Sequence, residues 1–311
     1  METLNAIAPL FAVILIGFAA VRTGYVPAEA LRPVGDIVLR IALPALIFLS
    51  VAGAPPGQGL QPAALIAIAT GSLTAFGVGI LTAVAILKIS LPRAAMIALG
   101  ISASNSGFIG YPIAQQLFGA AEAGRLLAHM MVVENLIIIP LAIVLSSETR
   151  DGGRGRALAL LRDLSRNPLI LALAASFAFR LLGLSLPDPA VRTLDLLARM
   201  SPPAALLIVG ATLAALRPQG QVGGVALITF GKLVLHPLFT LGAFAAIGGV
   251  PGSFVQGAVL FAAMPMVSIY PILCHSVGLS ALAATALMTA TIACTVTLAL
   301  WLPALRQLGF G

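Results

Sequence analysis

The sequence predicts an all-α integral membrane protein of about ten transmembrane helices, built as two inverted five-helix repeats with broken, crossing helices four and nine. Composition gives the first reason, because 60% of the 311 residues are hydrophobic and only 9% are charged. A soluble domain carries about 25% charged residues. A chain with so few charges cannot cover a water-facing surface, so the bilayer must be its solvent. The other two reasons are the lengths of the apolar runs and a repeat between the two halves.

Ten apolar runs have about the length that a membrane crossing requires. A spanning helix needs roughly 20 apolar residues, and only helices satisfy their own backbone hydrogen bonds in lipid at this length. The expected spans cover residues 4–21, 37–53, 63–87, 95–118, 126–146, 168–184, 195–216, 223–248, 254–278 and 281–303.

The two halves match when the sequence is shifted against itself by one constant offset. The matches include prolines, glycines and charged residues in register: Pro9 with Pro168, Gly24 with Gly183, Asp36, Arg40 and Pro44 with Asp195, Arg199 and Pro203, and Tyr111-Pro112 with Tyr270-Pro271. Residues 1–147 are therefore expected to form the first five-helix repeat, 148–166 a cytoplasmic linker and 167–311 the second repeat. Because five is odd, the second repeat enters the membrane inverted, as in many secondary transporters.

The distribution of Lys and Arg predicts how the chain is oriented. If the N-terminus lies outside, the inside loops carry ten of these residues and the outside segments carry four, which are Arg125, Arg180, Arg192 and Arg306. Cytoplasmic loops are enriched in basic residues. The sequence therefore predicts a multi-pass protein of the bacterial inner (plasma) membrane with both termini periplasmic, and topology rather than nucleic-acid binding explains the net charge of +7.

Clusters of Gly, Pro and polar residues interrupt the fourth and ninth spans at matching positions. Proline removes a backbone donor and clashes one turn back, so each cluster should unwind its helix in the membrane. Gly and Pro are also common in ordinary membrane helices, but their occurrence at matching positions favours a site. Half-helix N-termini there suit an anion. The expected substrate-binding residues are Ser104, Asn105, Ser106, Gly107, Tyr111, Pro112, Met266, Ser268, Tyr270 and Pro271.

Four polar residues in the fifth and eighth spans are candidates for coupling or charge sensing: Glu134, Asn135, Lys232 and His236. Ionisable groups are costly in lipid and point to function by default. Glu134 could take up a proton, help to bind a cation, or balance a basic residue. Lys232 could attract an anion or pair with Glu134. His236 could couple protons or be a satisfied core histidine.

Several motifs resemble those of the auxin efflux carrier family, which includes plant auxin exporters and bacterial malonate-type carriers. They are Asn105-Ser106-x3-Gly110-x-Pro112, the run from Leu43 to Ser50, Ala263-Met264-Pro265, and Lys232 followed by Pro237. The resemblance implies a ten-helix fold shared with bile acid/sodium symporters, a scaffold domain, a mobile core domain with crossed helices, dimerisation and elevator-type alternating access. Many members carry an Asn in the ninth span. Here Ser268, Ile269 and Tyr270 stand in its place, so Asn105 is left with Ser268 or Tyr270 as its partner.

The sequence thus predicts a secondary transporter that moves a small organic anion, a malonate-like carboxylate or an auxin-like weak acid, and is sodium-independent. A cation/proton antiporter and a ligand sensor with a transporter fold are the alternatives; the antiporter would need paired intramembrane carboxylates, and only Glu134 is present. No enzyme motif, cofactor site or metal site is recognisable. Membrane lipids and a second copy of the chain are the other expected partners. The exact substrate, the direction of transport and the driving force are left open.

Overall fold

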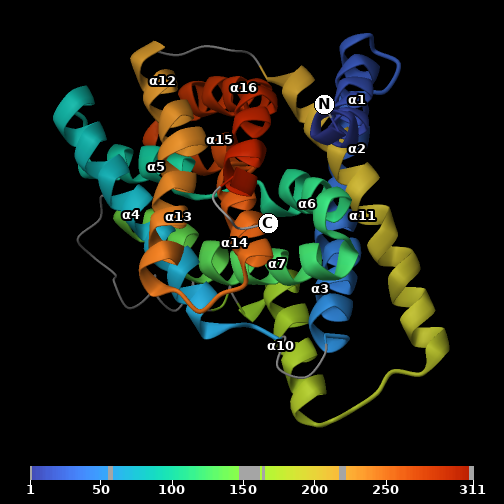
Figure 1. Ribbon diagram of the computed structural model, residues 1–311. Coiled ribbons are helices and arrows are strands. Elements are labelled where there is room, and N and C mark those ends of the chain that lie inside the picture. The colour runs from blue at the N-terminus through green and yellow to red at the C-terminus, as the bar shows by residue number, and fades with distance from the viewer. Residues whose placement is uncertain (1, 55–58, 147–161, 163–164, 217–221, 308–311) are drawn as a thin grey trace. The chain divides into compact units, whose positions relative to one another are not determined.

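The computed structural model describes residues 2–54, 59–146, 162, 165–216 and 222–307. Within these ranges the regular elements are all helices, with no strand, as Figure 1 shows. The all-α prediction is therefore confirmed for this part of the chain. The predicted linker, residues 148–166, lies outside the described residues except at 162, 165 and 166.

The helices are given below in chain order, where η1 to η4 are π-helical turns and η5 is a 3-10 turn. They are α1 (Glu2–Arg22), α2 (Ala28–Ile37), η1 (Val38–Ala42), α3 (Leu43–Ala52), α4 (Pro62–Leu87), α5 (Leu91–Ser102), η2 (Ser106–Gly110), α6 (Tyr111–Phe118), α7 (Ala120–Val133), η3 (Glu134–Ile138), α8 (Ile139–Leu145), α10 (Pro168–Leu181), α11 (Asp188–Ala215), α12 (Val222–Phe230), η4 (Gly231–Leu235), α13 (His236–Ile247), α14 (Gly252–Ala262), α15 (Tyr270–Leu273), η5 (Cys274–Val277) and α16 (Ser280–Gln307).

Six helical stretches among the described residues are long and apolar enough to cross a membrane: Glu29–Ala52, Pro62–Leu87, Ala120–Leu145, Asp188–Ala215, Val222–Ile247 and Ser280–Leu305. They coincide with the second, third, fifth, seventh, eighth and tenth expected spans. The first and sixth expected spans correspond to α1 and α10, and the fourth and ninth are interrupted helices. A membrane protein with six candidate spans is thus established, and the total of ten stays a prediction.

Each of the four π-helical turns ends two residues before a proline. The prolines are Pro44 after η1, Pro112 after η2, Pro140 after η3 and Pro237 after η4. Proline has no N–H and its ring clashes with the carbonyl one turn earlier, which explains why the preceding turn widens to the i→i+5 pattern. Two of these widened turns carry buried ionisable residues, since Glu134 begins η3 and Lys232 lies in η4.

One compact unit combines residues 1–61, 107–131 and 159–215. In it, α1 runs beside α11 (Figure 1). Glycines allow the two backbones to touch: a Cβ on Gly17 would come within 2.2 Å of the Leu207 carbonyl oxygen, and one on Gly210 within 1.9 Å of that of Ile14. Small residues at such crossings are how membrane helices pack tightly.

The second compact unit combines residues 62–106, 132–158 and 216–311. Its most extensive packing joins α4 to α5 and to α13. A Cβ on Gly71 of α4 would lie 2.5 Å from the Cα of Thr240 on α13. This close packing surrounds a group of fully or nearly fully buried polar side chains, among them Ser104, Glu134, Lys232 and His236.

Candidate functional site

Two helices of the second unit are broken, and the two breaks lie against each other. α5 ends at Ser102, and Ala103 continues in an extended conformation (φ −103°, ψ 134°). α14 ends at Ala262, and no helix resumes until α15 begins at Tyr270. The backbone N–H of Asn105 donates to the Pro265 carbonyl at 2.8 Å. Each break thus satisfies part of the backbone that the other exposes.

Asn105 also joins the breaks through its side chain. Its amide nitrogen Nδ2 donates to Ser268 Oγ at 2.7 Å. Of the two partners that the sequence left open, the structure pairs Asn105 with Ser268. A side-chain amide carries two hydrogens and a hydroxyl one, so after this bond each residue keeps a hydrogen to donate. Ser268 is only half-buried, and such a pair of donors suits a carboxylate.

Glu134 holds the first break from the side of the fifth span. Its Oε1 accepts from the Ser104 backbone N–H at 2.9 Å and from Ser106 Oγ at 2.8 Å. The side chain is almost completely buried, at 3% exposure. A buried carboxylate is tolerated only where donors replace water. Here those donors are a backbone N–H just beyond the end of α5 and the side-chain hydroxyl of Ser106.

Lys232 connects the first break to the second. Its ammonium donates to Ser104 Oγ at 2.7 Å, to His236 Nδ1 at 2.8 Å and to the Ala262 carbonyl at 2.7 Å. An ammonium has three hydrogens, and all three are used. Because Ala262 closes α14, this bond also caps a helix end whose carbonyls have no intrahelical donor. Among the described residues no ion pair joins Lys232 to Glu134; Ser104 lies between them.

His236 is fixed by hydrogen bonds at both ring nitrogens. An ammonium can only donate, so Nδ1 accepts from Lys232 and the ring hydrogen lies on Nε2, which donates to Ser72 Oγ at 3.0 Å. Lys232 and His236 are four residues apart, the spacing that places side chains on one helical face. His236 is thus a satisfied buried histidine that also orients Lys232.

A model of the membrane transport protein family matches residues 3–302. The chain belongs to this family, the family of the auxin efflux carriers. It is therefore a membrane transporter and not an enzyme, and a transporter of this family implies a small-molecule substrate. The expectation drawn from the motifs around Asn105 and Pro112 is confirmed at this level.

Two relatives of the transporter extend this result. The chain is 26% identical over 268 residues to a protein of Rhizobium meliloti named "Putative malonate transporter". This alignment covers 85% of this chain and 83% of the relative. It is 25% identical over 237 residues to a protein of Escherichia coli named "Uncharacterized transporter YfdV", with 75% of each chain covered. The similarity to both extends over three quarters or more of the transporter.

Three predicted site residues of the transporter fall in the first compact unit. They are Gly107, which lies in η2, and Tyr111 and Pro112, which open α6. Tyr111 lines a cavity of about 510 Å³ within this unit, together with Arg125 and Asp195. Asp195 forms an i, i+4 ion pair with Arg199 at 2.7 Å, the spacing at which opposite charges meet on one helical face.

The remaining predicted residues differ in their surroundings. Tyr270 is buried to 1% exposure and packs on α5, where a Cβ on Gly100 would lie 2.5 Å from its hydroxyl oxygen. Met266 is fully buried within the second break. Pro271 lies in the first turn of α15. Asn135 is half-buried in η3.

Three partners in the polar network were not foreseen from the sequence: the Ser72 hydroxyl and the carbonyls of Ala262 and Pro265. Ser72 lies in α4 with no distinguishing neighbour, so no local signal could have found it. For the Ala262 and Pro265 carbonyls, the only sequence signal was that Pro265 lies within the second break. The described residues contain no group of three or more His, Cys, Asp or Glu side chains that could hold a metal.

Proposed function

We propose that the protein is a secondary transporter that carries a small organic anion across the plasma membrane by elevator-type alternating access, independently of sodium. The observation that carries the proposal is the pairing of Asn105 with Ser268 across the two breaks, at 2.7 Å. Half-helix ends and polar side chains at matching breaks are the usual binding elements of transporters with inverted repeats.

The substrate is a carboxylate with a malonate-like or auxin-like structure. Asn105, Ser268 and the adjoining Ser104 and Ser106 supply donors, while Lys232 provides a buried positive charge that its hydrogen bonds to Ser104 and Ala262 hold at the breaks. Met266, Tyr270 and Pro271 shape the second break. One relative carries the name "Putative malonate transporter", which agrees with a short dicarboxylate.

Movement follows the ten-span plan with two inverted repeats, residues 1–147 and 167–311, joined by the linker 148–166. In support, two compact units exist, and each draws segments from both halves of the sequence. The unit that holds Asn105, Glu134, Lys232 and Ser268 would be the moving core with crossed helices, and the other the scaffold. The protein would act as a homodimer in the bacterial inner membrane, surrounded by lipid, with both termini periplasmic.

Coupling is assigned to Glu134 and Lys232, with Asn135 and His236 beside them. A sodium ion in such a site needs several oxygen ligands. The Lys232 ammonium already donates to two of the nearby oxygens, Ser104 Oγ and the Ala262 carbonyl. This favours protons or membrane potential over sodium as the driving force. The Glu134 carboxylate is the group at the breaks that could take up a proton.

The test is transport by the full chain in liposomes. Uptake of labelled malonate, and currents on adding mono- and dicarboxylates, would be measured with and without sodium for the wild type, Asn105→Ala and Ser102→Ala. Ser102 is a matched control because it is equally buried but its hydroxyl bonds only the Ala98 carbonyl of its own helix.

Carboxylate uptake that Asn105→Ala loses and Ser102→Ala retains is the expected result. Uptake that needs sodium would overturn the proposed sodium independence but would leave the assignment as an organic-anion carrier intact. Binding of carboxylates without any uptake would indicate a ligand sensor, and absence of both binding and uptake across the panel would reject the organic anion.

A further inference from the structure

The ammonium of Lys232 is surrounded by acceptors in the manner of a bound cation. The side chain is fully buried, and the ammonium donates to Ser104 Oγ at 2.7 Å, to the Ala262 carbonyl at 2.7 Å and to His236 Nδ1 at 2.8 Å. These acceptors come from the first break, the end of α14 and the start of α13. A buried cation needs such groups in place of water, and the fold brings a complete set of them to one point.

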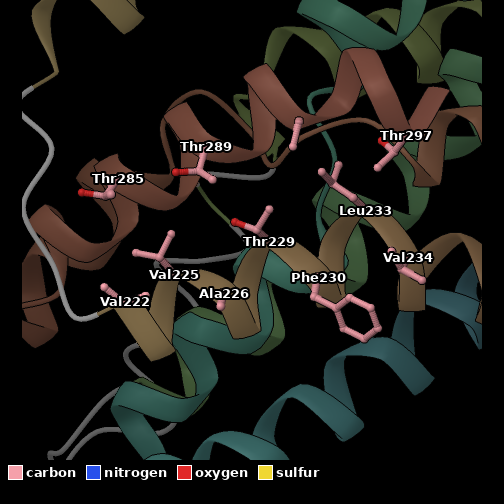
Figure 2. Close-up of a pocket in the computed structure, with 11 residues that line it drawn as sticks. Val222, Val225, Ala226, Thr229, Phe230, Leu233, Val234, Thr285, Thr289 and Thr297 are labelled. Atoms are coloured by element: carbon pink, nitrogen blue, oxygen red, sulfur yellow. The ribbon is translucent and has the colours of Figure 1, made fainter. Parts of the chain in front are cut away.

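Lys232 reaches this point from η4 and turns away from the apolar side of its helix. Figure 2 shows Phe230, Leu233 and Val234, its neighbours in the chain, along an apolar groove beside α16. Lys232 does not line this groove, so its side chain leaves the helix on a different side. Lysines in membrane proteins commonly extend the ammonium toward water, whereas this one directs it into the protein interior, where a charge without compensation is costly. Negative groups nearby have to offset it.

Two negative groups border the ammonium. The first is the end of α14 at Ala262, because the C-terminal end of a helix carries a partial negative charge. The second is Glu134, the only carboxylate among the described residues of the second unit. Glu134 accepts from the backbone N–H of Ser104, whose hydroxyl accepts from Lys232. Without the ammonium, both groups would repel an anion at the two breaks.

The end of a broken helix is also where secondary transporters bind a coupling cation. Unwound carbonyls and half-helix C-terminal ends coordinate sodium ions or protons in such proteins. In this chain the ammonium of Lys232 takes the end of α14. The residue after Ser104 is Asn105, whose N–H donates to the Pro265 carbonyl three residues beyond Ala262. The ammonium thus lies at the same two breaks as the proposed anion site.

We propose that Lys232 is the resident cation of the two breaks: its ammonium permanently fills a cation-binding site and supplies the positive charge that an anion beside Glu134 requires. A carrier with this charge built in needs no metal cation to travel with its substrate. For transport, the inference rests on the proposed function and names the residue that makes it independent of sodium. For the site at the end of α14, it can be tested without any transport.

Shortening Lys232 should turn the resident cation into one that has to be added. Lys232→Ala keeps one carbon of the four-carbon stem, so the part removed has the size of propylammonium. The acceptors left behind are two oxygens and one ring nitrogen, each of which accepted one N–H. A primary ammonium ion restores all three bonds, whereas hard metal cations prefer oxygen ligands alone and choline carries no N–H.

The first measurement is thermal unfolding of the full chain in detergent, with choline chloride replaced stepwise by propylammonium chloride at constant ionic strength. The midpoint of Lys232→Ala should rise by roughly 2 °C for each tenfold increase of propylammonium above its dissociation constant, as for any ligand that binds only the folded state. The wild type should not respond, because its own ammonium fills the site. Sodium chloride and the neutral isostere n-propanol should not stabilise Lys232→Ala in this way.

Three further variants separate a cation site from a simple cavity. Lys232→Met fills nearly the same space without a charge, so it leaves no room for the amine and should not respond. Leu99→Ala opens a cavity at another fully buried position of the second unit, one that held no charge, and should not respond either. Lys232→Ala/Glu134→Gln should respond less than Lys232→Ala, because the carboxylate that the cation balances is gone.

Malonate uptake in liposomes tests the consequence for transport. The wild type should take up malonate equally in choline, sodium and propylammonium, and labelled sodium should not enter with it. Lys232→Ala should lose uptake in choline and in sodium and regain it in propylammonium. A wild type without malonate uptake would reject the proposed function, and the unfolding midpoints would then decide alone whether Lys232 fills a cation site.

The proposal is overturned if Lys232→Ala gains nothing from propylammonium, or gains as much from sodium or n-propanol. It is also overturned if Leu99→Ala or the double variant responds as strongly as Lys232→Ala. Should Lys232→Ala fail to fold in choline, its recovery on purification in propylammonium replaces the midpoint shift. Should it fold in neither, the wild type decides: labelled sodium that enters with malonate contradicts a resident cation, and uptake without sodium entry supports it.

Discussion

Glu134 and Lys232 act on the same residue, Ser104: the carboxylate accepts from its backbone N–H at 2.9 Å, and the ammonium donates to its hydroxyl at 2.7 Å. Ser104 lies directly beyond the extended residue at which α5 stops. A single small residue therefore links the charged groups of two other candidate spans. Changes at Ser104 should be felt at both charges.

Ser104→Ala should destabilise the protein, whereas Ser102→Ala should not. The first change leaves one hydrogen of the buried Lys232 ammonium without an acceptor, which costs about 1–3 kcal/mol. The second removes only a bond to the Ala98 carbonyl, 2.8 Å away in the same helix, and alanine is the better helix former. Thermal unfolding in detergent measures the difference, and equal midpoints for the two variants would contradict the role given to Ser104.

Glu134→Gln and Lys232→Met should each be costly, and the double variant should cost less than their sum. Removing one charge takes away the opposite charge that offsets the burial of the other, and because Ser104 separates the two groups the cost should lie below the roughly 3–5 kcal/mol of a direct buried pair. Both side chains are at most 3% exposed, so water cannot replace the lost partner. Unfolding of the four proteins, wild type included, gives the coupling energy. Glu122→Gln is the control on the helix that precedes Glu134, because Glu122 pairs with Arg125 near the start of α7. Strictly additive costs would show that the two charges are independent.

The positions of the breaks could be predicted from the sequence, but the network that joins them could not. The clusters of Gly, Pro and polar residues in the fourth and ninth spans indicated where both breaks lie. Pro265 lies within the second break, whereas the first break, residues 103–105, contains neither Gly nor Pro and precedes Pro112 by seven residues. Which groups then fill the exposed hydrogen bonds depends on the packing of distant helices. The hydroxyl of Ser72 is 164 residues from His236 in sequence, and nothing near Ser72 indicates that contact. The link between Lys232 and Glu134 through Ser104 likewise required the structure.

The widened turns before prolines were also outside the sequence interpretation, although their signal was present. Lys232 was assigned to one continuous helical span, whereas the structure places it in a π-helical turn that ends two residues before Pro237. Lys232 lies five residues before Pro237, and Glu134 lies six residues before Pro140. The physical cause is the missing N–H of proline, which can be read from sequence once it is looked for.

Pro237→Ala should reduce transport without lowering stability. Alanine restores the N–H, so η4 can close to a regular α-helical turn, and removal of one widened turn rotates the following residues by about 100° relative to those before it. Lys232 and Ser104 would then lose their alignment. Proline within a helix is itself unfavourable by about 3 kcal/mol, so the midpoint of unfolding should be kept or raised.

The measurement compares uptake and thermal unfolding of Pro237→Ala with those of Pro303→Ala. Pro303 lies inside α16, where no π-helical turn occurs within the described residues. The control should transport normally. Full transport by Pro237→Ala would show that the widened turn does not position Lys232.

Asn105 and Ser268 should behave as a coupled pair in substrate binding. Each single alanine variant removes their bond of 2.7 Å, together with one donor that we assign to the carboxylate. The bond between them can be lost only once, so the effects should be non-additive by about 0.5–3 kcal/mol. Dissociation constants for malonate, obtained by calorimetry on Asn105→Ala, Ser268→Ala, the double variant and the wild type, complete the cycle. Additive losses would show that the two residues act on the substrate independently and that the bond between them does not position the carboxylate. Normal affinity in both single variants, with uptake still present in liposomes, would move the substrate site away from the two breaks while leaving the transporter assignment intact.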